Sequence, residues 1–142
     1  MNIRVLLVDD EKDFIEPLSQ RLQIRAIDVN TALSGDEALD FIQRNDVDVV
    51  VLDVLMPGKD GIATLKEIKR LRPLLQVIML TGHATVETAI EGMKFGAYDF
   101  LMKPTDTKDL VDKISKAHTI KTEHEERIRK AEINSIIQRK GW

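Results

Sequence analysis

Three acidic side chains, one hydroxyl and one amine each follow a short apolar run in this chain of 142 residues. Asp9 and Asp10 follow V-L-L-V, and Asp53 follows V-V-V-L. Thr81 ends the run V-I-M-L-T, and Lys103 ends F-L-M-K. Continuous apolar runs rich in Val, Ile and Leu are typical of buried strands in a parallel sheet. The pattern therefore predicts one sheet edge that gathers groups suited to handling a single phosphoryl group.

The chemistry of this set favours a divalent metal ion. Carboxylates that lie close together repel one another, so the cluster is costly without a cation. All its ligands are oxygens, which suits a hard ion such as Mg²⁺, and Mg²⁺ keeps positions open for water and phosphate oxygens. We expect phosphate to arrive on a metal bridge and Asp53 to act as a nucleophile that forms an acyl phosphate. Lys103 would then neutralise phosphoryl oxygens, and Thr81 would donate a hydrogen bond to one of them.

Strand and helix patterns alternate along the first 120 residues. We expect strands over residues 3–8, 26–32, 47–52, 77–80 and 98–102. Ser34 and Asp106 have the spacing of helix N-caps, and Gly96 is placed to end a helix. Apolar residues at helical spacing mark five intervening helices: Ile15, Leu18 and Leu22; Ala38, Leu39 and Ile42; Ile62, Leu65 and Ile68; Val86, Ala89, Ile90 and Met93; Leu110, Ile114 and Ala117.

This alternation predicts an α/β fold, a doubly wound five-stranded parallel sheet with helices on both faces. The first, third and fourth strands are apolar throughout, which favours central places, whereas the second alternates and the fifth is interrupted by Asp99. Positions at the edges of the sheet for the second and fifth strands favour the strand order 2-1-3-4-5. Ligands of such sheets bind outside the carboxyl ends of the strands, where the strand order reverses. Asp9, Asp10 and Asp53 are expected at that point.

Composition limits the class of protein. Apolar residues make up 43% of the chain and charged residues 32%, as in a soluble globular domain. The formal charge of −3 argues against direct nucleic-acid binding, and the absence of cysteine excludes disulfides and thiolate metal sites. The sequence has no run long enough to cross a membrane and no signal-peptide pattern at its start. We therefore expect a cytoplasmic protein that does not insert into a membrane.

Four motifs in order, V-D-D-E, L-D-V-L-M-P-G, L-T-G-H-A and L-M-K-P, resemble those of the receiver domain of bacterial two-component response regulators. The resemblance covers roughly residues 1–119 and implies a flavodoxin-like fold. It implies phosphorylation-dependent signalling, in which Asp53 accepts a phosphoryl group from a sensor histidine kinase in a Mg²⁺-dependent reaction. Such a domain catalyses only its own phosphorylation and dephosphorylation, so it is not an enzyme acting on external substrates.

The resemblance also implies the roles of individual residues. Asp10 and Asp53 would ligate Mg²⁺ directly, the backbone carbonyl of Leu55 would add a ligand, and Asp9 would act mainly through water. Thr81 and Lys103 match the hydroxyl and the lysine that sense the phosphoryl group.

Two further positions follow from the same comparison. The bond between Lys103 and Pro104 matches a peptide bond that is cis in the family. Tyr98 matches an aromatic switch that turns inward when Thr81 moves towards the phosphate. The resulting change would remodel the face of the fourth helix, fifth strand and fifth helix, where partners would bind.

The same residues are also consistent with other roles and functions. Asp9, Asp10 and Glu11 could be acids that open a helix and interact with its dipole. A phosphohydrolase with an aspartyl nucleophile, such as a haloacid dehalogenase, is a second class of function; Leu55 stands where that family has its general acid. A pure docking module is a third class, and the intact acidic cluster counts against it.

Residues 120–142 differ in character from the preceding receiver-like part, residues 1–119. From Lys121 onwards the tail holds six basic and four acidic residues, with no Pro or Gly before Gly141. We expect the fifth helix to extend into this tail. It is either a linker helix that pairs with a second copy of the chain or a frayed, charged helix, because its apolar residues form no sustained heptad. The chain could also be a fragment that has lost a downstream output domain.

Overall fold

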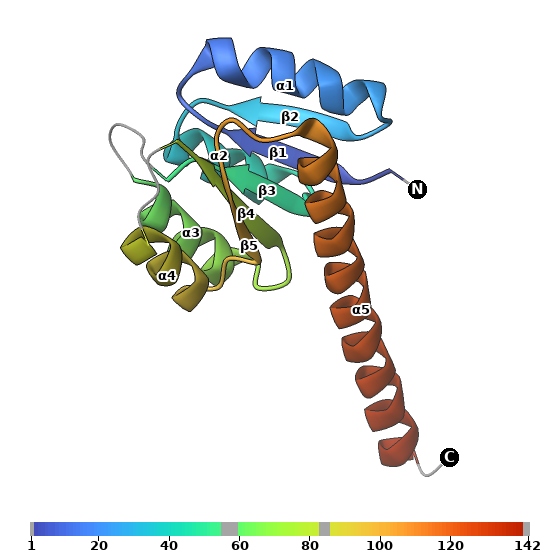
Figure 1. Cartoon of the computed structure of the whole chain (residues 1–142). Coiled ribbons are helices and arrows are strands. Elements are labelled where there is room, and N and C mark those ends of the chain that lie inside the picture. The colour runs from blue at the N-terminus through green and yellow to red at the C-terminus, as the bar shows by residue number, and fades with distance from the viewer. Residues whose placement is uncertain (1, 55–59, 83–85, 141–142) are drawn as a thin grey trace.

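A computed structural model describes residues 2–54, 60–82 and 86–140 of the chain, and all structural statements refer to these residues. The described chain alternates strands and helices from β1 to α5 (Figure 1). The predicted ligand Leu55 and the Pro57-Gly58 turn lie outside the described residues.

The sheet is built from five parallel strands in the order β2-β1-β3-β4-β5, as predicted. Each strand is short, and the three internal strands are almost entirely buried. Edge strand β2 buries only Val29 and Ala32 among its five residues, as expected for a strand at the edge of the sheet. The strands are β1 (Arg4–Val8), β2 (Asp28–Ala32), β3 (Val49–Leu52), β4 (Gln76–Thr81) and β5 (Asp99–Met102).

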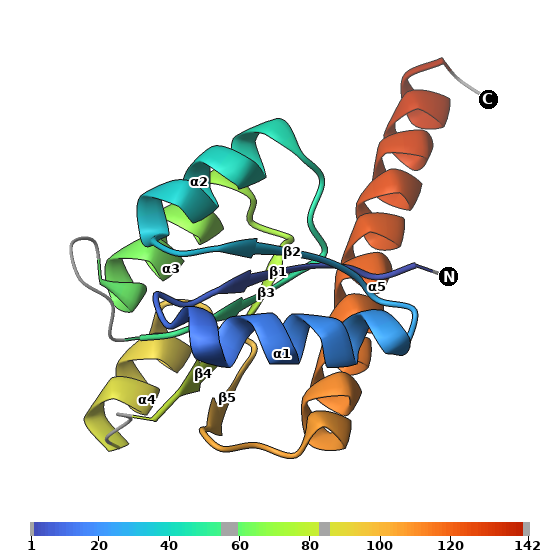
Figure 2. The same cartoon turned by 90° about the horizontal axis from the view of Figure 1, so that it is seen from above.

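Helices cover both faces of the sheet, which confirms the doubly wound α/β fold. One apolar cluster joins the sheet to α2 and α3, and a second joins the opposite face to α1 and α5. Figure 2 shows α2 and α3 on one side of the strands and α1 on the other. The helices are α1 (Lys12–Ile24), α2 (Gly35–Arg44), α3 (Gly61–Leu71), α4 (Val86–Lys94) and α5 (Thr107–Lys140).

The predicted helix ends are confirmed by their contacts. The Ser34 hydroxyl accepts a hydrogen bond from the Glu37 amide at 3.1 Å, which satisfies one free N–H at the start of α2. The Asp106 carboxylate accepts one from the Lys108 amide at 3.0 Å, at the start of α5. Gly96 follows α4 with φ of 103°, a left-handed conformation that favours glycine at the end of a helix.

Helix α4 differs from the others because its apolar stripe is not buried. Val86 is 76% exposed, Ile90 62% and Met93 46%. Gly92 is its only buried residue among those described, and it packs against the side chain of Met79 on β4. Neighbouring apolar side chains that remain exposed often mark a contact surface for another molecule.

Helix α5 continues past the sheet as one helix, as the uninterrupted tail sequence predicted. It packs on the sheet through Leu110, Ile114 and Ala117, and then projects away from the body (Figure 1). Ile128, Ile133 and Ile136 on this projection are each more than 40% exposed. Within the described ranges, no helix combines the length and apolar character required to cross a bilayer.

Candidate functional site

The paired strands β1 and β3 bring Asp9 and Asp53 together. Val8 at the end of β1 is paired with Leu52 at the end of β3, so the next residue of each strand lies at the same sheet edge. The Asp53 amide donates a hydrogen bond to the Val8 carbonyl at 2.9 Å, which holds the two chain ends in register. Both side chains are buried, at 4% exposure for Asp9 and 3% for Asp53.

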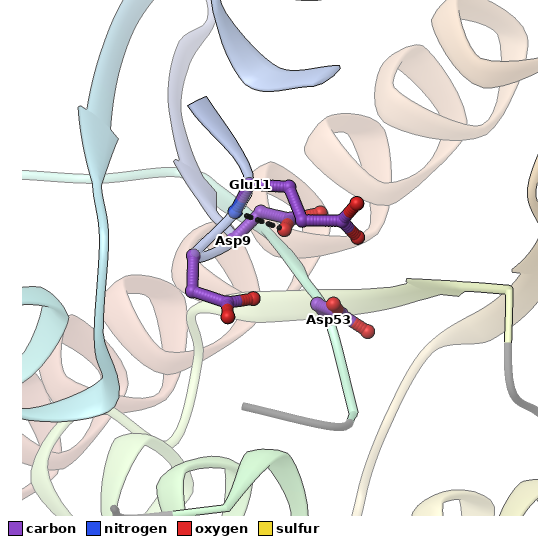
Figure 3. Close-up of side chains that lie close together, drawn as sticks. Asp9, Glu11 and Asp53 are labelled. Carbon is purple, nitrogen blue, oxygen red and sulfur yellow. Dashed lines mark hydrogen bonds between the residues drawn. The ribbon is translucent and has the colours of Figure 1, made fainter. Parts of the chain in front are cut away.

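Four carboxylates gather at this edge: Asp9, Asp10, Glu11 and Asp53 each offer an oxygen, and these oxygens all lie within 4.8 Å of one another. Figure 3 shows Asp9, Glu11 and Asp53 with their carboxyl groups in one region. Asp10 and Glu11 are exposed, so the cluster opens to solvent on one side. A set of oxygen donors with this excess of negative charge fits a hard divalent cation such as Mg²⁺.

Lys103 supplies a positive charge to the cluster. Its Nζ lies 2.6 Å from Asp9 Oδ2, 3.3 Å from Glu11 Oε1 and 3.6 Å from Asp53 Oδ2. Its side chain is only 13% exposed, so solvent screens these contacts less than those of a surface pair. The lysine is therefore within reach of a phosphoryl group on Asp53.

The contacts with Lys103 do not offset the effect of burial on the Asp9 carboxyl. Burial raises the pKa of the Asp9 carboxyl, with the charge of Asp53 adding to the effect, although hydrogen bonds from Lys103 and the Glu11 amide act in the opposite direction. Burial lowers the pKa of Lys103, but its hydrogen bond to Asp9 and the nearby carboxylates outweigh this and leave it raised. The lysine remains charged, and Asp9 is less easily ionised than an ordinary aspartate.

Thr81 ends β4 beside this region and is fully buried. Its carbonyl accepts a hydrogen bond from the Lys103 amide at 2.9 Å, so the two predicted phosphoryl-sensing residues are linked through the backbone. The bond between Lys103 and Pro104 is cis, as expected. The sheet therefore brings Thr81 and Lys103 to the same edge as the acids.

Gly61 packs against the backbone that carries Asp53, a contact that the sequence alone did not single out. Its amide donates a hydrogen bond to the Val54 carbonyl at 2.8 Å. A Cβ at this position would overlap the Asp53 carbonyl oxygen and the Val54 Cα, which are backbone atoms that cannot turn aside. The absence of a side chain at residue 61 lets the start of α3 approach the site closely.

Tyr98 is not placed beside Thr81. Its amide donates to the Val77 carbonyl at 2.7 Å, and Val77 is four residues before Thr81 on β4, roughly 13 Å along the strand. Tyr98 packs against the apolar cluster that contains α1 and α5. Phe100 is opposite Met79 and packs against the other cluster. Because Met79 and Thr81 share a face of β4, Phe100 is the aromatic on the Thr81 side.

The structure adds one side chain that the motif analysis missed. The Phe14 ring centroid lies 4.2 Å from Lys103 Nζ, and Phe14 belongs to the first turns of α1, directly after the acids. Its position three residues after Glu11 in a helix that starts at the site was the available signal. The predicted Leu55 ligand lies outside the described residues.

Comparisons with known proteins agree with this geometry. The model of the response regulator receiver domain family matches residues 5–115. The transcriptional regulatory protein ZraR of Escherichia coli is 42% identical over 116 residues, which are 82% of this chain and 26% of that protein. The DNA-binding transcriptional regulator NtrC of Klebsiella pneumoniae is 36% identical over 129 residues, covering 91% of this chain and 27% of that protein. The chain thus spans about a quarter of the length of the curated relatives it matches.

Solved structures resemble the fold over most of the described chain. The receiver domain of NtrX from Brucella abortus superposes with a TM-score of 0.77 at 36% identity, covering 81% of this chain and 98% of that one. A CheY-like receiver domain protein from Methanospirillum hungatei has a TM-score of 0.83 at 27% identity, with 87% and 99% coverage. Sequence motifs, strand order, acidic cluster and family match agree, and the chain belongs to the receiver domain family of two-component response regulators.

Proposed function

We propose that this chain is a Mg²⁺-dependent phosphoacceptor domain in which Asp53 receives a phosphoryl group from a sensor histidine kinase. The observation that carries the proposal is the position of Lys103 Nζ, 2.6 Å from Asp9 and 3.6 Å from Asp53, beside a four-carboxylate cluster. One carboxylate of the cluster can act as nucleophile while the others and the lysine balance charge. The domain would signal by its state of phosphorylation and would not turn over external substrates.

The transfer is a substitution at phosphorus. An oxygen of the Asp53 carboxylate forms the new O–P bond while the P–N bond to the donor histidine breaks. The leaving imidazole nitrogen takes the bonding electron pair and then a proton. Burial of Asp53 and its position at the end of β3 hold the nucleophile on a rigid element, which restricts the direction from which its carboxylate can attack phosphorus.

The carboxylates of Asp9, Asp10 and Asp53 would hold Mg²⁺, with Asp9 acting mainly through water and the Leu55 carbonyl as a further ligand. When bound, the ion supplies charge neutralisation for the phosphoryl oxygens and orients them. Lys103 adds a mobile point charge on a flexible stem, able to follow the phosphoryl oxygens as they arrive. Thr81 donates its hydroxyl hydrogen to one of them.

Phosphorylation would act as a switch by favouring one packing of the fold over another. It adds a charge of about −1.5 to −2 and three acceptor oxygens at the sheet edge. Lys103 and Thr81 would be drawn towards these oxygens, and their movement would be transmitted to α4, β5 and α5. The exposed residues Val86, Ile90 and Met93 give the α4 part of this face the apolar character of a partner surface.

The aromatic part of the switch remains a prediction. Tyr98 lines a cavity of about 320 Å³ with four residues of α5, Ser115, Lys116, Thr119 and Ile120. A change in the position of the Tyr98 side chain would therefore alter its packing against α5. Phe100, in contrast, is the aromatic residue on the Thr81 side of the sheet. Comparison of Tyr98→Leu with Phe100→Leu decides between them. The true switch residue is the one whose replacement abolishes the phosphorylation-dependent change in α4 chemical shifts while leaving labelling of Asp53 intact.

The proposal extends to the partners and the arrangement of the chain. Residues 1–119 would form the receiver domain, and residues 120–142 a charged helical linker to a downstream output domain or partner. The exposed isoleucines of the α5 projection would support pairing with a second copy of the chain. The setting would be the cytoplasm, where response regulators typically operate. Comparison of the mass in solution with and without beryllofluoride, a phosphoryl mimic, tests the pairing and its dependence on phosphorylation.

Incubation with acetyl phosphate and Mg²⁺ tests the central proposal. We expect intact-mass spectrometry to show one stable phosphoryl group per chain, lost on chelation of the metal and absent from Asp53→Asn. Asp28→Asn, a change at an exposed residue that begins β2 at the opposite end of the sheet, is the matched control and should be labelled normally. Repeated release of phosphate would indicate a phosphohydrolase, and labelling of the Asp53→Asn variant would refute the assignment of the nucleophile.

A further inference from the structure

The ammonium of Lys103 has two different kinds of neighbour. It meets the carboxylates of Asp9, Glu11 and Asp53. It also lies over the Phe14 ring, 4.2 Å from the centroid. A cation within about 6 Å of an aromatic centroid is attracted by the negative face of the ring. The ring and the carboxylates therefore both attract the same positive charge.

Phe14 is well placed to be a fixed surface. It lies in the first turns of α1, and its amide donates a hydrogen bond to the Glu11 carbonyl at 3.1 Å. Its side chain is half-buried and packs against the apolar cluster that contains Ile15 and Leu18. Part of the ring is thus anchored in the core while its face meets Lys103. If Phe14 served only to pack the core, its ring face would not need to contact the charged group of Lys103.

An aromatic ring and an acid would hold the lysine with different consequences. A carboxylate in place of the ring would accept an N–H of Lys103 and would add another negative charge next to the incoming phosphoryl group. The ring attracts the cation without a directed hydrogen bond and without a net charge. All three N–H donors of the ammonium stay available for carboxylate or phosphoryl oxygens.

We propose that Phe14 is a positioning residue for phosphoryl transfer, whose ring holds the Lys103 ammonium at the site and lets it move between Asp9 and the phosphoryl oxygens. This role rests on the proposed function of the chain as a phosphoacceptor. Movement of the ammonium across the ring face breaks no oriented bond to Phe14. The lysine can therefore exchange its carboxylate partners for phosphoryl oxygens while staying close to the ring.

Fluorination of the ring tests this role, because fluorine withdraws electron density from the ring face with little change in its shape. Phenylalanines carrying one, two or three fluorines are placed at residue 14, and beryllofluoride binding is measured with saturating Mg²⁺. We expect the apparent affinity to fall stepwise, by roughly threefold to thirtyfold in total. The same series at Phe41, on α2 at the other face of the sheet, is the control and should leave the affinity unchanged.

Replacement of Phe14 by other natural amino acids distinguishes a positioning role of its ring from a packing role. Phe14→Leu keeps an apolar side chain but has no ring, so it should lose as much affinity as the trifluorinated protein. Phe14→Tyr and Phe14→Trp keep an aromatic face and should stay within about twofold of the wild type. Thermal unfolding of each protein monitors the core, and the affinity loss should not follow the melting temperature.

A second readout does not depend on phosphorylation. The ring current of Phe14 should shift the ε-methylene protons of Lys103 upfield in NMR spectra, and the shift should vanish in Phe14→Leu. Absence of the shift overturns the proposal, as does an affinity that stays constant along the fluorinated series while wild-type Asp53 is labelled. Failure of the wild type to accept a phosphoryl group from acetyl phosphate instead overturns the proposed function, and the role of Phe14 with it.

Discussion

Lys121 Nζ lies 3.1 Å from Asp48 Oδ1, which ties the projecting part of α5 to the residue that precedes β3. Asp48 is 3% exposed and also accepts hydrogen bonds from the Arg4 amide at 2.9 Å and from its guanidinium. The aspartate thus joins β1, β3 and α5 at the end of the sheet opposite the acidic cluster. This network gives the α5 projection a defined direction relative to the body.

Removal of the Lys121 charge is expected to destabilise the chain. In Lys121→Met, Asp48 keeps only Arg4 as a cationic partner among the described residues, and we expect a loss of about 1 to 3 kcal/mol in the free energy of unfolding. Hydrogen exchange should also become faster in the first turns beyond residue 119. Lys130→Met, an exposed change on the same helix, should alter stability by less than about 0.5 kcal/mol. Equal effects of the two changes in urea denaturation would show that the contact between Lys121 and Asp48 contributes nothing to the free energy of unfolding.

The same network predicts how stability depends on pH. Burial tends to raise the pKa of the Asp48 carboxyl, but the hydrogen bonds from Arg4 and Lys121 outweigh it and leave the pKa below its ordinary value of 3.8. A folded-state pKa below the unfolded one stabilises the fold above the unfolded value, and this stabilisation is lost as pH falls through the folded value. The stability difference between wild type and Asp48→Asn should therefore be constant from pH 7 to about 5 and shrink below about 4. A difference that grows on acidification would contradict the assignment.

The close approach of α3 to the nucleophile predicts the effect of adding a methyl group. Gly61→Ala places a Cβ against backbone atoms of Asp53 and Val54, and we expect a loss of about 1 to 3 kcal/mol in unfolding free energy. Because the strain falls on the backbone of Asp53, phosphorylation by acetyl phosphate should slow as well. Gly82→Ala is the matched control, since among the described residues its Cβ would meet only Lys103 side-chain atoms at 3.8 Å or more, an ordinary contact. Similar stability of both variants would exclude the predicted clash.

Removal of Lys103 should affect metal binding and phosphoryl transfer in opposite directions. Lys103→Met removes the cation that competes for the carboxylates, and we expect Mg²⁺ to bind about three- to tenfold more tightly by calorimetry. The phosphorylation rate should fall nonetheless, because the charge that neutralises the phosphoryl oxygens is missing. Lys108→Met, an exposed change at the start of α5, should alter neither quantity. Weaker Mg²⁺ binding by Lys103→Met would show that the lysine supports the metal site and does not compete with it.

Fold prediction succeeded where local patterns and global packing agree. The apolar runs before Asp9 and Asp53 are long enough to identify buried strands, and the alternating second run identified β2 as an edge. The capping residues Ser34 and Asp106 act within one turn of their helices, so their role depends only on nearby sequence. The stripe of α4 was less informative, because helical spacing shows that one face is apolar but not whether anything covers it.

The sequence alone was enough to predict the strand order, because the fully apolar runs had to be the central strands. It also predicted the edge at which the acids gather, because ligand sites of such sheets lie at the carboxyl ends of the strands. The contacts between distant side chains became known only from the folded chain. Three of these contacts join separate elements: Phe14 with Lys103, Lys121 with Asp48, and Gly61 with the Asp53 backbone. The folded chain also showed that Phe100, and not Tyr98, lies on the Thr81 side of the sheet. Such contacts depend on how helices rotate and pack on the sheet, and no local pattern in the chain specifies that.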